Sequence, residues 1–178
     1  EEVQPLVDLA LERFGRVDVL VNNAGVMPLS PLAALKVGEW NRMIDVNIRG
    51  VLHGIAAVLP SMQQRRAGQI INVASIGAYK PIATGAVYCA TKAAVVSLSE
   101  ALRQEVGADI RVTVVSPGVT ESDLAETISD GATLEMIREF RRGAIPASVI
   151  AEAIAYAIGQ PAAVDVSELV IRPTSSAY

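Results

Sequence analysis

Residues 17–25 read VDVLVNNAG, an apolar run that two asparagines and a glycine interrupt. Runs of the same kind occur at 70–78, IINVASIGA, which turns polar at Ser75, and at 112–118, VTVVSPG, which ends in Pro117 and Gly118. Short apolar runs that turn residues bound are typical of buried strands. We therefore predict four strands, at residues 17–21, 70–74, 110–115 and 168–171.

Segments with a helical pattern separate these strands. In residues 3–14 the apolar positions are spaced for one face of a helix, and further helices are predicted at 37–59, 88–106 and 148–159. Strands that alternate with helices imply a parallel sheet with helices on both faces. The predicted fold class is therefore α/β, a doubly wound, Rossmann-like parallel sheet of which only the later strands are present.

Polar and small residues follow the predicted strands. In open parallel sheets, ligands lie outside the carboxyl ends of the strands. The residues at these ends are Asn23, Ala24, Gly25, Ser75, Pro117 and Gly118. Asn and Gly tolerate positive φ, so residues 22–25 taken alone would also suit an ordinary turn.

Tyr88 and Lys92 stand four residues apart in VYCATKAAV, residues 87–95. On a helix such side chains rise from the same face, with Cβ atoms about 5 to 6 Å apart. A phenol becomes a useful base near neutral pH when its pKa falls by about 2 to 3 units, or about 3 to 4 kcal/mol. One ammonium about 4 to 5 Å away supplies that energy at an effective dielectric constant of about 20. The alternative is an exposed Tyr and Lys on a surface helix.

The order of these motifs is more specific than any one of them. Asn-Asn-Ala-Gly, the asparagine in MIDVNIRG at 43–50, Ser75, Tyr-x-x-x-Lys and Pro-Gly follow one another at spacings that resemble the classical short-chain dehydrogenase/reductase family, over essentially the whole chain. The resemblance implies an enzyme that transfers a hydride between NAD or NADP and a small alcohol or ketone.

By this resemblance, four residues carry the chemistry. Tyr88 is the general acid or base, and Lys92 stabilises its phenolate and holds the nicotinamide ribose. Ser75 polarises the substrate oxygen, and Asn47 holds a water that links to Lys92. The residues implied to bind the cofactor are Asn23, Ala24, Gly25, Tyr88, Lys92, Pro117, Gly118, Val119 and Ser122.

The last third of the chain bears on the substrate. Segment 117–122 reads PGVTES where the family usually has PGxVxT, so Thr120 replaces the valine and Ser122 the threonine. In the family, the region that corresponds to residues 120–143 is a mobile lid, whose apolar residues either face substrate or form the buried side of two short helices. The closing segment, VDVSELVIRPTSSAY, is similar to the ends of bacterial 3-hydroxy acid and serine dehydrogenases, which favours a small hydroxy or keto compound, such as a hydroxy acid, and slightly favours NADP.

No G-x-G-x-x-G fingerprint occurs in the chain, which starts at Glu1. We therefore interpret residues 1–178 as a single domain, the C-terminal catalytic part of a longer NAD(P)-binding chain. If these residues were the whole protein, the strand at 17–21 would be a sheet edge. The choice between NAD and NADP stays open without the fingerprint. Two alternatives remain: a catalytically silent homologue that binds a dinucleotide or a partner protein, and a truncated fragment without function.

Composition argues against several other classes. The net charge is −4 and basic residues are scattered, so neither nucleic acid nor an anionic membrane is expected as a partner. No apolar run approaches the ~18 to 20 residues that are needed to span a bilayer. The single cysteine, Cys89, precludes an intrachain disulfide and is compatible with a reducing cytoplasm. With one Cys and one His, no metal site is expected.

The predicted helix that carries Tyr88 also has apolar residues suited to contact another helix, namely Ala94, Leu98, Ala101 and Leu102. By resemblance, the neighbouring helix belongs to another subunit, which implies a homodimer or homotetramer. The alternative is packing within the subunit.

Overall fold

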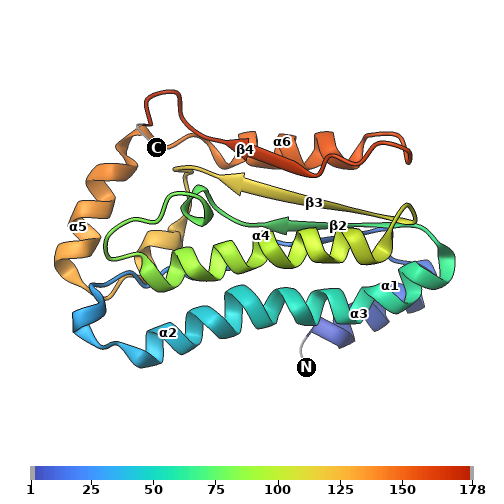
Figure 1. Cartoon of the computed structure of the whole chain (residues 1–178), viewed down its shortest axis with the longest axis horizontal. Helices are drawn as coiled ribbons and strands as arrows, with labels where there is room; N and C mark the ends of the chain where they lie inside the picture. The colour runs from blue at the N-terminus through green and yellow to red at the C-terminus, as the bar shows by residue number, and fades with distance from the viewer. Residues whose placement is uncertain (1–2, 177–178) are drawn as a thin grey trace.

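The computed structural model describes residues 3–176, in which helices alternate with strands (Figure 1). The strands differ from their predicted bounds by no more than two residues at either end. The helices are α1 (Val3–Phe14), α2 (Val37–Ile44), α3 (Gly50–Arg65), α4 (Ala86–Val106), α5 (Gly131–Phe140) and α6 (Ala147–Ile158). The strands are β1 (Val19–Asn22), β2 (Gly68–Val73), β3 (Ile110–Pro117) and β4 (Glu168–Ile171).

The four strands form one parallel sheet in the order β1-β2-β3-β4. Val21 pairs with Ile71, and Ile71 pairs with Thr113 on the other side. Parallel neighbours need crossover connections, which the helices between the strands supply. The predicted fold class is confirmed, and the carboxyl ends of all four strands lie at the same edge of the sheet.

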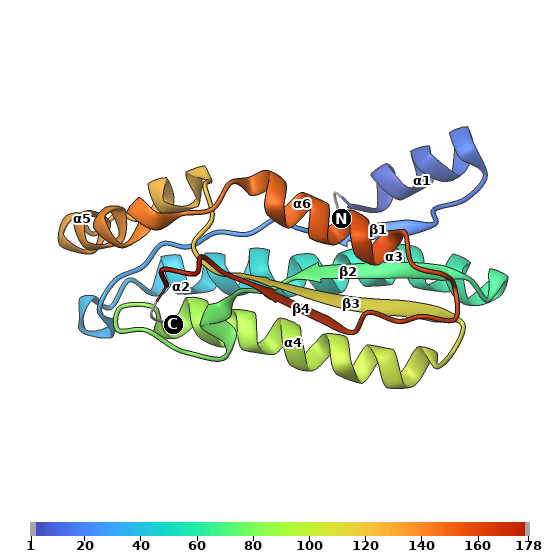
Figure 2. The same ribbon diagram turned by 90° about the horizontal axis from the view of Figure 1, so that it is seen from above.

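Helices lie on both sides of the sheet (Figure 2), and alternate strand residues pack against opposite helical layers. Ile70 and Val112 pack in one cluster with residues of α3 and α4, whereas Ile71 and Val115 pack with Ile150 of α6. This alternation follows from the period of two along a strand. The sheet is therefore covered on both faces, as parallel sheets usually are.

The predicted helix at 37–59 continues to Arg65 and contains a π-helical turn, Asp45–Arg49, between α2 and α3. By length and composition, Val37–Arg65 could cross a membrane, with 28% of its most apolar window buried. The expectation that no stretch approaches spanning length is therefore wrong. One such helix is weak evidence for a membrane protein, because a core helix passes the same test, and this segment packs against α1, β1 and β2.

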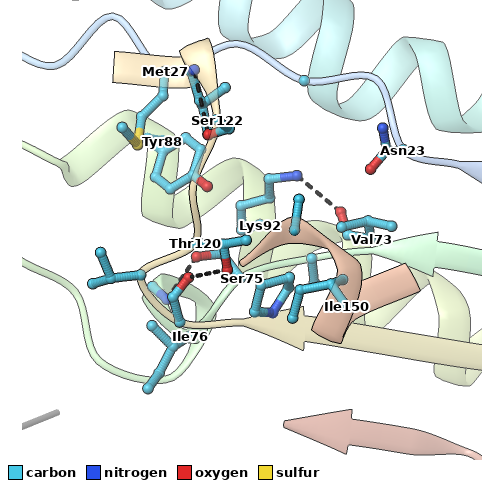
Figure 3. Close-up of a pocket in the computed structure, with 18 of the residues that line it drawn as sticks. Asn23, Met27, Val73, Ser75, Ile76, Tyr88, Lys92, Thr120, Ser122 and Ile150 are labelled. Atoms are coloured by element: carbon cyan, nitrogen blue, oxygen red, sulfur yellow. Dashed lines mark hydrogen bonds between the residues drawn. The ribbon is translucent and has the colours of Figure 1, made fainter. Parts of the chain in front are cut away.

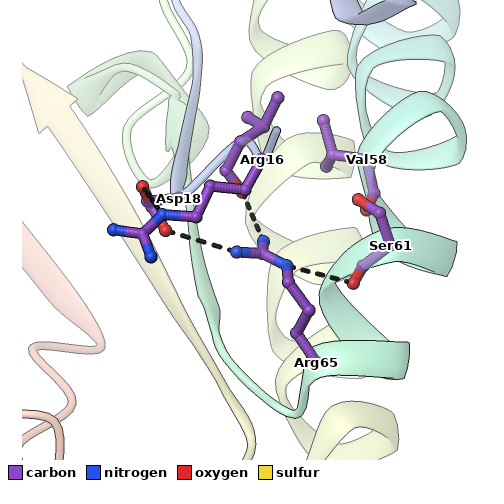
Figure 4. Close-up of polar contacts among 6 residues, drawn as sticks. Arg16, Asp18, Val58, Ser61 and Arg65 are labelled. Atoms are coloured by element: carbon purple, nitrogen blue, oxygen red, sulfur yellow. Dashed lines mark hydrogen bonds and ion pairs between the residues drawn. The ribbon is translucent and has the colours of Figure 1, made fainter. Parts of the chain in front are cut away.

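Arg65, at the end of α3, holds the start of β1 (Figure 4). Its guanidinium donates hydrogen bonds to the carbonyl oxygen of Val17 at 2.6 Å, to Oδ1 of Asp18 at 3.3 Å and to the carbonyl oxygen of Ser61 at 3.3 Å. The Val17 carbonyl is thus engaged by a side chain, and strand pairing begins at Val19 instead of residue 17.

β1 lies at the edge of the described sheet, as expected. Val21 on this strand is 39% exposed, and Leu6 and Phe14 of the neighbouring α1 are 67% and 77% exposed. A strand edge with unpaired backbone groups and exposed apolar side chains is prone to pair with another chain or to aggregate.

Candidate active site

A cavity of about 920 Å³ lies at the carboxyl ends of β1, β2 and β3 (Figure 3). The structure brings nearly all of the predicted site residues together around it. The predicted residues that line it are Asn23, Ala24, Gly25, Ser75, Tyr88, Lys92, Pro117, Gly118, Val119 and Ser122. This convergence follows from the parallel order of the strands, because each strand delivers its polar end to the same edge of the sheet.

Helix α4 presents Tyr88 and Lys92 to the cavity on its buried face. The Lys92 ammonium donates a hydrogen bond to the carbonyl oxygen of Val73 at 2.8 Å, and Nζ lies 6.0 Å from the centre of the Tyr88 ring. The alternative of an exposed surface pair is therefore wrong. Further along the same face, Leu102 is buried in the core of its own subunit, which removes it from the expected subunit contact.

Burial changes the titration of both side chains. Burial raises the pKa of Tyr88, against a smaller opposing effect of a hydrogen bond from Ser75. Burial lowers the pKa of Lys92 to about 8. The expected fall in the pKa of the phenol is therefore wrong for this structure, because desolvation disfavours each charged form more than any attraction between them favours it.

Ser75 follows β2 in an extended conformation and begins the short 3-10 helix Ile76–Ala78. Its hydroxyl oxygen accepts a hydrogen bond from the Gly77 amide at 3.1 Å. A cap of this kind fixes the side chain next to the helix start and leaves the hydroxyl hydrogen to donate to the Tyr88 oxygen.

Asn47 lies in the π-helical turn and is 1% exposed. Its Oδ1 accepts from the Val26 amide at 2.9 Å, and its Nδ2 donates to the Val26 carbonyl at 3.0 Å and to Oγ1 of Thr91 at 3.1 Å. Asn47 thus ties the loop after β1 to helix α4. It is not among the residues that line the cavity, and its predicted link to Lys92 through a water stays a prediction.

The segment after β3 is held by the end of β4 and the residue that follows it. The Gly118 amide donates to the Ile171 carbonyl at 2.6 Å. A Cβ on Gly118 would lie 2.7 Å from Cβ of Arg172 and 3.0 Å from its Cα, so only glycine fits here without movement of that backbone. The Ser122 hydroxyl accepts from the Leu124 amide at 3.4 Å, and its predicted contact with the cofactor stays a prediction.

The predicted lid, residues 120–143, comprises the 3-10 helix Asp123–Thr127, helix α5 and the turn Arg141–Gly143. Ile128 and Ile137 are buried, Leu124 and Leu134 are half-buried, and Met136 is 48% exposed. Of the two alternatives, Ile128 belongs to the buried side of a short helical segment and does not face the cavity. Leu124 and Ile137 line the cavity, where they can face a substrate.

Several cavity residues were missed by sequence reasoning. They are apolar residues from three separate segments, Met27, Leu29, Ile82, Cys89 and Phe140. An apolar residue in a loop or on a helix carries no signal that separates a cavity wall from ordinary core. Only the tertiary packing around the cavity identifies them. Among residues 3–176, no three His, Cys, Asp or Glu side chains are grouped so that they could hold a metal ion.

Comparison with known proteins agrees with this geometry. A model of the short chain dehydrogenase family matches residues 1–133. The chain belongs to the short-chain dehydrogenase family. This short-chain dehydrogenase is 49% identical over 178 residues to an uncharacterized oxidoreductase from Staphylococcus saprophyticus, with 98% of this chain and 72% of the relative covered.

Solved structures of the family superpose well on the chain. Serine dehydrogenase in its closed form, complexed with NADP+, gives a TM-score of 0.87 at 30% identity. The match covers 98% of this chain and 74% of the serine dehydrogenase chain. Alcohol dehydrogenase from the archaeon Thermococcus sibiricus, complexed with 5-hydroxy-NADP, gives a TM-score of 0.84 at 29% identity. The match covers 98% of this chain and 70% of that protein. The resemblance seen in the sequence is therefore confirmed, and the chain is an oxidoreductase of this type.

Proposed function

We propose that this short-chain dehydrogenase transfers a hydride between NAD or NADP and a small alcohol or ketone, with NADP slightly favoured. The observation that carries the proposal is the convergence of Ser75, Tyr88 and Lys92 on one cavity at the carboxyl ends of parallel strands. The two solved relatives described above were complexed with NADP+ and 5-hydroxy-NADP, which supports the cofactor class. Hydroxy acids belong to the candidate substrates.

The residues around the cavity fit a nicotinamide dinucleotide. Within residues 3–176, the Lys92 ammonium donates to one acceptor, the Val73 carbonyl, although it carries three hydrogens. The other hydrogens suit the hydroxyls of a ribose. Gly25 leaves space beside this ammonium, where a Cβ would make ordinary van der Waals contacts, 3.4 Å from Oδ1 of Asn47 and 3.5 Å from Nζ of Lys92. With Lys92 and Tyr88, the residues proposed to hold the cofactor are Asn23, Ala24, Gly25, Pro117, Gly118, Val119 and Ser122.

The mechanism needs a proton donor and an oxygen-binding group from the protein. The hydride chemistry at the substrate carbon would come from NAD or NADP when it is bound. In reduction, Tyr88 donates its phenolic proton to the carbonyl oxygen, and in oxidation its phenolate takes the alcohol proton. Burial keeps the phenol protonated, which suits the donor role. Ser75 donates a hydrogen bond to the substrate oxygen, and the Lys92 ammonium stabilises the phenolate.

The matched variants Tyr88→Phe and Tyr79→Phe test this mechanism. Each removes one hydroxyl, but Tyr79 lies outside the cavity, where its hydroxyl is 3.1 Å from that of Ser116. With a panel of hydroxy acids and simple ketones, Tyr88→Phe should lower kcat by at least about 100-fold and leave NADP binding intact, because only the proton transfer is lost. Tyr79→Phe should keep its turnover.

The outcomes separate the proposal from its rivals. A Tyr88→Phe enzyme with near-normal kcat would contradict the role of Tyr88. Calorimetric binding of NADP by the unaltered protein, without turnover of any substrate in the panel, would support a silent homologue.

We further propose a homodimer or homotetramer in the cytoplasm. Ala101 of α4 is exposed, and Ala94 and Leu98 are half-buried, so these three side chains remain available for a contact between subunits. Small and branched apolar residues at this spacing suit close packing of helices. Light scattering at micromolar concentration tests the assembly, and a monomer would contradict it.

A further inference from the structure

One side of the cavity, which we call the lid-side wall, is formed by Met27, Leu29, Ile82, Cys89 and Ile137. All five side chains are uncharged, and all five belong to the apolar cluster that also contains Tyr88. Figure 3 shows Met27 beside the Tyr88 ring. A substrate whose oxygen meets the Tyr88 hydroxyl therefore lies with one substituent against this wall.

The charged side chains that line the cavity are Lys80, Lys92, Glu121, Asp123 and Arg141. Lys80, Glu121 and Asp123 are exposed. Apart from Lys92, these side chains comprise two cations and two anions, so the rim gives no net attraction for an anionic substrate.

Besides the exposed Lys80, the cations that line the cavity are Arg141 and Lys92, and both donate hydrogen bonds to backbone carbonyls. Arg141 donates through Nη2 to the Thr120 carbonyl at 3.0 Å and to the Ser122 carbonyl at 2.6 Å. Lys92 donates one hydrogen to the Val73 carbonyl, and its other two are those proposed above for the ribose of the cofactor. A carboxylate placed against the lid-side wall would lose its hydration without gaining a charged partner, which is strongly unfavourable.

Resting on the function proposed above, we propose that the lid-side wall selects an uncharged ketone or secondary alcohol with an apolar substituent and excludes carboxylated analogues. This narrows the substrate class and speaks against hydroxy acids. The wall offers dispersion contacts and removes apolar surface from water, which favours an apolar group at that position.

A pair of ketones with the same carbon chain tests the inference. The ketones are 5-oxohexanoate and its methyl ester, which differ by one charge and by the ester methyl group, and each is reduced with NADPH. We expect kcat/KM to favour the ester by at least about 100-fold, because the carboxylate stays unpaired at the wall. Equal or better reduction of the carboxylate would overturn the inference and leave the proposed function intact.

Substitution of Met27 tests whether the lid-side wall is the source of the preference for the ester. Met27 is half-buried and lines the cavity, and only its backbone amide bonds to the lid, to Oγ1 of Thr127 at 3.2 Å. Met27→Lys adds a cation at the wall and should reduce the preference for the ester by at least about tenfold through pairing with the carboxylate. Met27→Leu, the matched apolar control, should retain the preference. If both variants kept the ratio of kcat/KM between ester and carboxylate that the unaltered protein shows, the lid-side wall would not be the source of the preference.

A binding measurement decides the inference without turnover. Each ketone is titrated by calorimetry into protein saturated with NADP+, which cannot reduce it. At least tenfold tighter binding of the ester supports the inference, and equal binding of the two overturns it. If neither ketone is reduced with NADPH while the ester still binds more tightly, the proposed function fails for this pair and the inference about the wall stands.

Discussion

The buried ammonium of Lys92 should make the stability of the protein depend on pH in a defined window. Its pKa is lowered by burial from 10.5 to about 8, and the side chain is 5% exposed. Between these two values the unfolded chain binds more protons than the folded one, so the free energy of unfolding rises with pH. At pH 7 the charged form destabilises the fold by about 3 kcal/mol. From pH 7 to 9.5 about 2 kcal/mol of this is recovered.

The assay is urea unfolding, without dinucleotide, at several pH values from 7 to 9.5. Lys92→Met removes the titrating group and keeps a side chain of similar length, so the rise of about 2 kcal/mol should be missing in this variant. Lys80→Met, which removes an exposed lysine, controls for the loss of a positive charge. The window stops below pH 10 because burial raises the pKa of Tyr88 above its ordinary value of 10.0, and the fold loses stability at higher pH.

The difference between Lys92→Met and the unaltered protein isolates the contribution of this one side chain, since every other group titrates in both. If the two proteins showed the same pH dependence, the ammonium would not be desolvated as the structure indicates. Lys92→Met should also be inactive, because it lacks the cation that the proposed mechanism requires.

Two further substitutions test the packing around the site by denaturant unfolding. Gly54→Ala should destabilise the fold by about 1 to 3 kcal/mol, because the new Cβ would lie 2.2 Å from Oδ1 of Asn22, whose amide is bonded to Oδ1 of Asn72. Unchanged stability would mean that the Asn22 side chain moves aside at no cost. Arg111→Ala should lower the free energy of unfolding by about 1 to 3 kcal/mol, because Arg111 donates to the carbonyls of Ala157, Ile158 and Gln160 at the end of α6. Arg103→Ala, at an exposed ion pair, is its control and should change stability by less than about 1 kcal/mol.

Apart from the π-helical turn between α2 and α3 and the helix α5, the sequence alone determined the order and type of the helices and strands. Each has a hydrophobic period that is local, and Gly15 and Gly107 follow α1 and α4 at positive φ. Alternation of strands and helices then implied the parallel sheet and the edge at which the site residues meet. The spacing of Tyr88 and Lys92 was equally local, since four residues along a helix are enough to put both side chains on one face.

Tertiary structure decided everything that depends on neighbours distant in sequence. The π-helical turn at Asn47 lies where that side chain bonds to Val26 and Thr91, and neither partner is visible from residues 43–50. The pKa of Tyr88 rises instead of falling because the lid and the loop after β1 remove water from it, which a pairwise estimate with Lys92 omits. The lid-side wall likewise exists only once three apolar segments fold against α4, because burial depends on all contacts around a side chain and not on its own chemistry.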